Sequence, residues 1–343
     1  MTRPSRSAER IALKHGAGGR AMRRLIEEVF LPLATPVDGV GLSALDDGAA
    51  LRVGDRFLVL TTDSHVVQPI FFPGGDIGRL AVCGTVNDLA MMGATEPLGL
   101  TCAAVVEEGF AREDLERVVA SMREAASEAQ APIVTGDTKV MGKGQLDGLV
   151  LNTAGVGFAE RVVTDAGLSP GDLLIVTGTL GDHGMAVMAR RHDLGLLGDL
   201  KSDVAPLNGL VREALRAGGQ DVVAMKDPTR GGLAGVLHEL AAKARVGIVL
   251  DEPALPVKDE VRAAAEMIGI DPLLVANEGK AVLGVRAGAA ERVLAALHAH
   301  PLGRRAVVVG RATAERPGTV ILHTGFGRRI LAEPEGELLP RIC

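Results

Sequence analysis

Leu80-Ala-Val-Cys-Gly-Thr-Val-Asn87-Asp88-Leu-Ala-Met-Met92 is the stretch of this chain that decides its fold. Its side chains are apolar on nearly every face, which predicts a buried helix. The residues one turn away from Asp88 are Gly84, Thr85, Met91 and Met92, and none of them can neutralise a carboxylate. Burying an unpaired carboxylate is costly, so Asp88 needs partners from elsewhere in the chain. It is either a structural residue with distant hydrogen-bond donors or the ligand of a cation.

Alternating strand and helix patterns surround this helix. Before residue 160, strands are expected over 56–63, 98–107 and 133–135, the last ending at a Gly136-Asp137 turn, and helices over 20–30, 78–92 and 112–130. After a linker-like segment at 167–172, strands are expected over 173–177, 248–250, 281–285 and 306–309, and helices over 178–191 and 207–217. The alternation predicts α/β or α+β layers. The expected parts are an arm and helix at 1–40, domains at 41–158 and 168–330, and a tail at 334–343.

The composition excludes several classes of function. The chain has 343 residues with a net charge of −6, no Trp and no Tyr, which argues against nucleic-acid binding by charge or by aromatic stacking. No apolar run approaches the roughly 18 residues of a membrane span, and the N-terminus lacks the apolar core of a secretory signal. The three cysteines, Cys83, Cys102 and Cys343, are too few for a disulfide framework. We therefore expect a cytoplasmic protein with reduced thiols.

Aspartates at predicted strand ends suggest a cation site. They are Asp46, Asp47, Asp63, Asp137 and Asp227, each next to a strand or a glycine-rich turn. Any one of them could be a turn or N-cap residue. Together with Asp88 they resemble the oxygen ligands of Mg²⁺, which is usually held by a few carboxylates plus phosphate oxygens.

Glycine-rich helix starts suggest where an anion could bind. Arg230-Gly231-Gly232 and the segment 181–184 would each offer backbone N–H groups to a phosphate. The chain has neither a Walker A motif nor a Rossmann fingerprint, so a nucleotide site must be of another type.

The chain ends in a thiol. Residues 334–343 carry two prolines and a glycine without helical or strand periodicity, which is typical of a flexible tail. Fully extended, ten residues reach roughly 30 Å. Cys343 is therefore either a reactive sulfur on a swinging arm or an incidental thiol at a frayed terminus.

Motifs along the whole chain resemble the HypE family of hydrogenase maturation factors. They lie at 61–64, 71–78, 85–90, 135–140, 181–184, 227–232 and 276–280, and at the terminal Pro340-Arg341-Ile342-Cys343. The family belongs to the superfamily of aminoimidazole ribonucleotide synthetase (PurM), selenophosphate synthetase and thiamine-monophosphate kinase. The terminal Arg-Ile-Cys is its most specific element. One departure is His65, where an aromatic residue is expected.

The resemblance implies a two-domain PurM-like fold with a flexible C-terminal tail. Its N-terminal domains would form a dimeric β-barrel, its C-terminal domain would be α/β, and ATP and Mg²⁺ would lie between the domains. The implied metal ligands are Asp46, Asp47, Asp63, Asp88 and Asp227. The implied nucleotide-binding residues are Asp47, Asp63, Asp88, Gly136, Asp137, Thr138, Asp227, Gly231 and Gly232. A further glycine-rich patch at 15–19 is either disordered or, as the family resemblance implies, closes over bound phosphates.

The family reaction explains a thiol on a mobile arm. It is the ATP-dependent dehydration of a carbamoyl group on the terminal sulfur, which would here be that of Cys343, to a thiocyanate. The resemblance implies acid/base or electrostatic roles for Lys139 and Glu278. The carbamoyltransferase HypF would load the thiol, and the cyanide would pass to the iron on the HypC–HypD scaffold. Cys83 and Cys102 are expected to be packing residues.

Two other interpretations remain open. One is a different ATP-dependent enzyme of the superfamily, such as selenophosphate synthetase or a small-molecule kinase. The selenium enzyme is expected to carry a reactive Cys with a nearby Lys in the N-terminal arm, whereas residues 14–19 contain only Lys14. The other is a non-catalytic carrier whose Cys343 accepts a group and passes it on.

Overall fold

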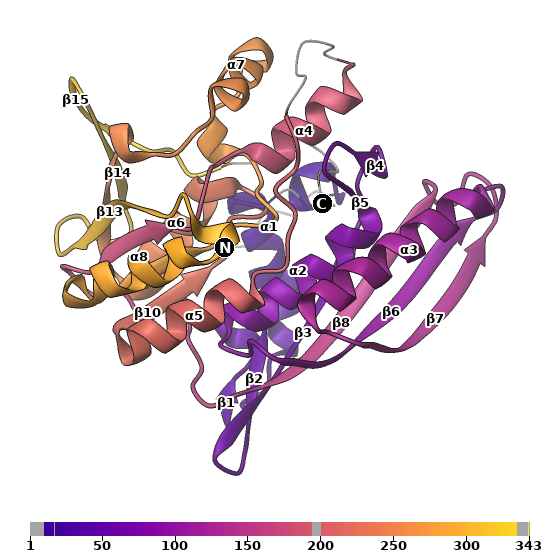
Figure 1. Cartoon of the computed structure of the whole chain (residues 1–343), viewed down its shortest axis with the longest axis horizontal. Coiled ribbons are helices and arrows are strands. Elements are labelled where there is room, and N and C mark those ends of the chain that lie inside the picture. The colour runs from indigo at the N-terminus through magenta and orange to yellow at the C-terminus, as the bar shows by residue number, and fades with distance from the viewer. Residues whose placement is uncertain (1–9, 17, 194–199, 335–341, 343) are drawn as a thin grey trace, which may run out of the picture.

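The computed structural model describes residues 10–16, 18–193, 200–334 and 342. Two β-sheets with their helices lie side by side and form two α/β units (Figure 1). The six-stranded sheet has the order β1-β2-β3-β8-β6-β7, and the seven-stranded sheet has the order β10-β12-β9-β13-β11-β14-β15. The predicted mixed α/β architecture is confirmed. No helix among the described residues is long and apolar enough to cross a membrane.

The first sheet is built from residues before 160. Its strands are β1 (Gly39–Val40), β2 (Ala49–Val53), β3 (Arg56–His65), β6 (Pro97–Glu107), β7 (Ile133–Met141) and β8 (Leu149–Ala159). Helices α2 (Ile77–Met91) and α3 (Arg112–Ala129) cover one face, and the short hairpin β4 (Phe71–Phe72) and β5 (Gly75–Asp76) precedes α2 (Figure 1). Within this chain β1 and β7 are the sheet edges, and the described residues close no barrel.

Helix α2 is buried on both sides, as its sequence predicts. Asp76 caps its N-terminus by accepting hydrogen bonds from the N–H groups of Gly78 and Arg79 at 2.7 and 3.0 Å. Leu80 and Leu89 pack in the core of the first unit, whereas Met91 packs in a core shared with the second unit. The helix is thus an element of both domains, and its position fixes the cleft between them.

The second sheet is built from residues after 172. Its strands are β9 (Leu173–Val176), β10 (Val222–Lys226), β11 (Gly247–Asp251), β12 (Val282–Val285), β13 (Val307–Thr313), β14 (Val320–Thr324) and β15 (Gly327–Ile330). Its helices are α4 (Asp182–Arg191), α5 (Asn208–Gly218), α6 (Gly232–Ala244), α7 (Asp259–Ile268) and α8 (Ala290–Ala299). Leu174 and Ile175, adjacent on β9, belong to different cores, which contain α6 and the pair α5 and α8 respectively. Helices therefore cover both faces of this sheet.

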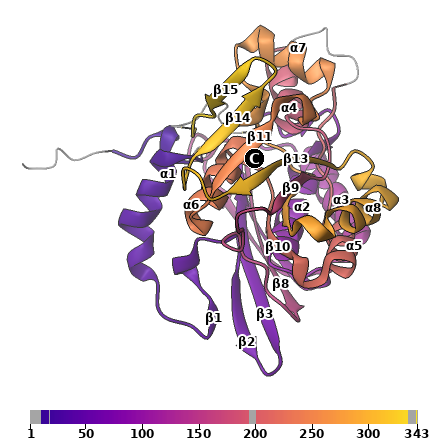
Figure 2. The same ribbon diagram turned by 90° about the vertical axis from the view of Figure 1, so that its left-hand side faces the viewer.

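The N-terminal arm packs on the second unit. Helix α1 (Arg20–Leu25), followed by a π-helical turn at Ile26–Phe30, lies beside α6 (Figure 2). Arg23 pairs with Glu239 of α6 at 3.9 Å and with Glu333 at 3.0 Å. Gly19 has a φ of +75°, and a Cβ there would lie 2.1 Å from the carbonyl oxygen of Pro334. This contact requires glycine and places the arm beside the start of the tail.

The expected turn at Gly136-Asp137 is wrong. Both residues lie inside β7, where they pair with Cys102 and Ala103 of the long neighbouring strand β6. An available partner strand overrides the local turn preference of a Gly-Asp pair. Asp63 likewise lies within β3 and not at its end. The strand patterns also missed β8 and β10, which are essential to the two sheets.

Asn87 of α2 links the two units. Its side-chain N–H groups lie 3.2 and 3.3 Å from the carbonyl oxygens of Ala205 and Glu278, and its Oδ1 accepts from the N–H of Leu207 at 2.7 Å. We predict that Asn87→Ala lowers the free energy of unfolding by about 1–3 kcal/mol because buried polar groups lose their partners. Thermal unfolding followed by circular dichroism measures this loss. Glu124→Ala on the exposed face of α3 is the control, and an equal effect of the two variants would contradict the prediction.

Candidate nucleotide and metal site

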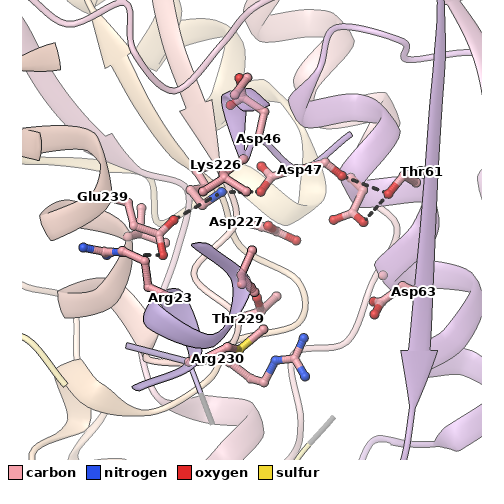
Figure 3. Close-up of a pocket in the computed structure, with 18 of the residues that line it drawn as sticks. Arg23, Asp46, Asp47, Thr61, Asp63, Lys226, Asp227, Thr229, Arg230 and Glu239 are labelled. Atoms are coloured by element: carbon pink, nitrogen blue, oxygen red, sulfur yellow. Dashed lines mark hydrogen bonds and ion pairs between the residues drawn. The ribbon is translucent and has the colours of Figure 1, made fainter. Parts of the chain in front are cut away.

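A cavity of about 620 Å³ lies between the two units. Strand β3, helix α2, the segment after β10, helix α6 and the N-terminal arm all contribute to its lining (Figure 3). Six predicted acidic residues line it: Asp46, Asp47, Asp63, Asp88, Asp227 and Glu278. The fold therefore brings together carboxylates that are up to 232 positions apart, counted from 46 to 278.

Three of these aspartates form a tight cluster. Oxygen atoms of Asp47, Asp88 and Asp227 all lie within 4.8 Å of one another. The hydroxyl of Thr61 lies 2.9 Å from both the carbonyl oxygen of Asp47 and Oδ2 of Asp88, so it can donate to either (Figure 3). Burial raises the pKa of Asp88 well above its ordinary range, and repulsion from Asp227 adds to this. Burial, followed by repulsion from Asp47, raises the pKa of Asp227 to about 8. Such a cluster favours a bound divalent cation.

A buried lysine stands beside this cluster and was missed from the sequence. The ammonium of Lys226 pairs with Asp47 and lies 3.5 Å from Glu239 and 3.6 Å from Asp165 (Figure 3). Burial alone would lower the pKa of Lys226, but these carboxylates outweigh it and raise the pKa. The lysine therefore stays charged. Its position directly before Asp227, at the end of an apolar strand, is the signal that could have revealed it.

Asp46 has a different environment from Asp47. Its carboxylate accepts a hydrogen bond from the backbone N–H of Asp165 at 3.1 Å, and it is outside the cluster of three aspartates. Asp165 is itself held by Lys243, whose ammonium donates to it and to the carbonyl oxygen of Leu45, both at 2.6 Å. These contacts fix the acidic turn at 46–47 against α6.

Asp63 is oriented by the residue that departs from the family pattern. Its Oδ2 lies 3.1 Å from Nε2 of the buried His65, and its Oδ1 accepts from the N–H of Ser64 at 2.8 Å. Burial would raise the pKa of Asp63, but attraction by His65 and Arg230 outweighs it and lowers the pKa. The carboxylate therefore stays ionised and faces the cavity. Phenylalanine at position 65 could not provide this contact.

Glu278 is a buried residue of the cavity lining. It is 3% exposed, and its Oε1 has no hydrogen-bond partner within the described part of the chain. Its backbone N–H donates to Oδ1 of Asp203 at 3.1 Å, which fixes the main chain. Burial, followed by repulsion from Asp227 and Asp63, raises the pKa of Glu278 well above its ordinary range. A carboxylate of raised pKa is a stronger base once it has lost its proton.

The predicted residues on β7 lie outside this cavity lining. Gly136, Asp137, Thr138 and Lys139 are exposed, and the ammonium of Lys139 pairs with Asp137 at 3.0 Å. Asp137 pairs with Ala103 on β6, Ala103 with Asn152 on β8, and Asn152 with Ser64 on β3. Three strand spacings, roughly 14 Å, therefore separate Asp137 from Ser64, which lines the cavity of the same chain.

The glycine-rich start of α6 borders the cavity. Gly231, at the N-cap, has a φ of +83° and no side-chain cap, whereas the N–H of Gly232 donates to the carbonyl oxygen of Thr229 at 2.9 Å. Gly231 and Gly232 themselves are not among the cavity-lining residues, whereas the preceding Thr229 and Arg230 are (Figure 3). Gly18 and Gly19 of the arm line the same side.

The three cysteines differ in their surroundings. Burial raises the pKa of Cys83 to about 12 and also raises the pKa of Cys102. Both side chains therefore remain thiols near neutral pH, which makes them poor nucleophiles. Cys343 lies outside the described residues, although the preceding Ile342 is described and buried.

Known proteins share this fold and this chain length. Residues 45–159 match the AIR synthase related protein, N-terminal domain, and residues 169–323 match the corresponding C-terminal domain. Carbamoyl dehydratase HypE of Rhizobium leguminosarum bv. viciae is 50% identical over 338 residues, covering 97% of this chain and 95% of the relative.

Two solved structures have the same architecture. One is the structure of a HypE–HypF complex, in which the matched chain is 45% identical to this chain with a TM-score of 0.84. The match covers 90% of this chain and 99% of that chain. The other is HypE in complex with ATP, which is 41% identical to this chain with a TM-score of 0.81. The match covers 97% of this chain and 100% of that chain. The two matched domains and the cleft between them define a protein of the AIR synthase related class. Within that class, this chain belongs to the HypE carbamoyl dehydratase family.

We predict that Asp88→Asn abolishes ATP hydrolysis but stabilises the metal-free protein near pH 8. The raised pKa means that the folded chain binds the Asp88 proton more tightly than the unfolded chain does. Stability is therefore lost as pH rises from the unfolded-state pKa through the folded-state pKa. Asn keeps the shape and removes this repulsion. Thermal unfolding in a chelator should give a higher Tm for the variant near pH 8, with a smaller difference near pH 5.

Asp55→Asn, in the exposed turn between β2 and β3, is the matched control and should change neither property. Wild-type ATP hydrolysis by Asp88→Asn would mean that Asp88 is a structural residue.

Proposed function

We propose that this protein is an ATP-dependent carbamoyl dehydratase that converts an S-carbamoyl group on its own Cys343 into a thiocyanate. The nitrile would supply cyanide ligands for the iron of [NiFe]-hydrogenases. The observation that carries the proposal is the cleft, in which the clustered carboxylates of Asp47, Asp88 and Asp227 lie in one cavity with Glu278. Membership of the HypE family and the ATP complex of a 41% identical relative support it.

The chemistry requires a better leaving group than oxide. The carbamoyl oxygen attacks the γ-phosphorus of ATP and ADP leaves, so that the oxygen becomes part of a phosphate ester. One nitrogen proton is lost as the carbon–nitrogen double bond forms. The C–O bond then breaks with phosphate as the leaving group, the second nitrogen proton is lost, and S–C≡N remains. The sum is carbamoyl thioester plus ATP giving thiocyanate, ADP and phosphate.

The charges in the cleft fit a metal-bound nucleotide. We propose that Asp47, Asp88 and Asp227 hold Mg²⁺ with help from Asp63 and Asp46. The ion would neutralise phosphate charge as it is transferred. Arg230 and Lys226 also line the cavity and add positive charge, and we propose that the start of α6 at Gly231 and Gly232 lies near the phosphates. Gly18 and Gly19 of the arm would lie over the nucleotide.

Two further side chains would act on the carbamoyl group. Glu278 is proposed to take the nitrogen proton, because it is buried, lacks a partner for Oε1 and has a raised pKa. Lys139 is proposed to stabilise the developing charge on oxygen, with Gly136, Asp137 and Thr138 contacting the nucleotide. Because β7 lies three strands from β3 in the same chain, we propose that these four residues serve the cleft of a second subunit.

The proposed partners follow from the same reaction. HypF would supply the carbamoyl group, in keeping with the solved HypE–HypF complex. The HypC–HypD scaffold would receive the cyanide in the cytoplasm. A passive thiol carrier would not need a cluster of buried carboxylates, so the cleft favours the enzyme.

The central test concerns the terminal thiol. We predict that Cys343→Ser leaves folding and ATP binding unchanged but eliminates the nitrile product, because no other sulfur carries the carbamoyl group. Intact-mass spectrometry after incubation with the carbamoyltransferase, its substrates and ATP should show loss of one water from the carbamoylated wild type only. Cys83→Ala should give the opposite result, with some loss of stability but normal product. Dehydration in the Cys343→Ser variant would contradict the mechanism.

We also predict a homodimer formed through the first sheet. The edge strand β7 carries the exposed apolar residues Ile133, Val134, Val140 and Met141, and Leu60 on β3 and Leu98 on β6 of the same sheet are also exposed. A second copy would cover them and complete a barrel across the two chains. Sedimentation at micromolar concentration should give twice the chain mass of 35.5 kDa. A species of the single-chain mass alone would refute the dimer.

A further inference from the structure

The residue before the terminal cysteine is docked in the protein. Ile342 is 5% exposed and belongs to the same core cluster as Phe72 and Val204. Its carbonyl oxygen lies 2.9 Å from Nε2 of His183, in the first turn of α4. A residue at the end of a solvated tail would show neither the burial nor a buried polar partner. The expectation of a freely swinging terminus is therefore incomplete, because this end of the tail has a binding site.

The contacts of His183 fix its protonation state. A carbonyl oxygen can only accept, so Nε2 carries the hydrogen and donates to Ile342. Nδ1 must then accept, and it lies 2.8 Å from the hydroxyl of Ser202, which donates to it. The same hydroxyl accepts from the N–H of Val204 at 3.1 Å. Burial, the largest influence, lowers the pKa of His183, so the ring is neutral and matches this arrangement.

The ring is also held in orientation. Phe72 of β4 contacts it edge to face, with centroids 5.3 Å apart and an interplanar angle of 90°. Ser202 is anchored on the same hairpin, because its N–H donates to the carbonyl oxygen of Pro73 at 2.8 Å. Phe72 and Ser202 therefore hold the imidazole through contacts that do not involve the tail, which is the preorganisation expected of a docking group.

Hydrogen bonds connect the residues around His183 with those around Glu278, the proposed base. Asp203, next to Ser202, accepts from the N–H of Glu278 at 3.1 Å and lies 3.2 Å from the ammonium of Lys280. At the other side of His183, the N–H of Gly181 donates to Oδ1 of Asn277, next to Glu278, at 2.7 Å. Two independent links therefore fix the distance between His183 and Glu278.

We propose that His183 is a positioning residue that docks the C-terminal tail by donating a hydrogen bond to the carbonyl oxygen of Ile342. The burial of Ile342 in the apolar core favours an aliphatic side chain at this position. Because consecutive Cα atoms are about 3.8 Å apart, holding Ile342 would limit how far the sulfur of Cys343 can move from this site. This inference rests on the proposed function, since docking serves the reaction on Cys343.

The first test measures the reaction in a single turnover. Full-length protein carbamoylated on Cys343 is mixed with saturating ATP, and dehydration is followed by mass. We expect His183→Leu to slow the step about tenfold, as loss of one buried hydrogen bond would, with the Kd for ATP unchanged. His183→Gln should restore most of the rate, because its amide can donate from a similar position. His298→Leu is the control, because His298 on α8 makes a similar contact, with its Nε2 2.8 Å from the carbonyl oxygen of Ala306.

The second test does not depend on the reaction. Unloaded protein is treated with iodoacetamide, and alkylation of Cys343 is measured on its C-terminal peptide by mass spectrometry. His183→Leu should increase this rate several-fold, whereas His183→Gln and His298→Leu should match the wild type. Ile342→Ala should also increase it, and the double variant should add little to either single change, because both remove the same dock.

The outcomes separate the two proposals. Wild-type dehydration and alkylation rates in His183→Leu would overturn the docking role. So would equal losses of dehydration and ATP affinity, which indicate a structural role, or a failure of His183→Gln to improve on His183→Leu. If the wild-type protein performs no dehydration, the proposed function fails, but the alkylation rates still decide whether His183 docks the tail.

Discussion

Mutual repulsion among buried carboxylates is the constraint on which this structure depends. Asp47, Asp88 and Asp227 come from three separate segments and converge within 4.8 Å. Beside burial, repulsion from Asp227 and Asp47 raises the pKa of Asp88, and repulsion from Asp47 raises that of Asp227. Nothing in the hydrophobic effect would favour that arrangement. It persists because apolar packing around α2 holds Asp88 in place and because cations compensate the charge. Part of the stability that the aliphatic cores of both units provide therefore offsets the repulsion between these carboxylates.

The two-sided burial of α2 explains how distant parts of the chain meet. Leu89 packs in the first unit and Met91 in the second, while Asn87 bonds to main-chain atoms near Glu278 and Leu207. Because α2 contacts both domains, it fixes their positions relative to each other. The carboxylate of Asp88 therefore lies at the junction without needing a mobile loop to carry it there, and the cleft is largely formed before a ligand binds.

The sequence predicted the elements with strong periodicity and the residues with unusual chemistry. The bounds of α2, β6 and α3 were correct to within a residue or so. Six acidic residues of the cavity were foreseen, whereas Glu27 and Glu239 were not. Strand β8 was missed because its alternating pattern contains several glycines, which weaken a strand signal. Lys226 and His183 were missed because a single lysine or histidine at the end of an apolar run has many ordinary explanations. Only the fold shows that carboxylates surround the first and that a main-chain carbonyl faces the second.

Lys226 gives the cleft a resident counter-ion. Because its ammonium is part of the chain, it stays beside Asp47 at an effective concentration that dissolved cations do not reach. A divalent ion that arrives alone must compete with this lysine for Asp47. An ion that arrives with a triphosphate brings negative oxygens that offer the displaced ammonium a new partner. The cleft is therefore biased toward the metal–nucleotide complex over the bare ion, and the acidic cluster can remain folded between turnovers.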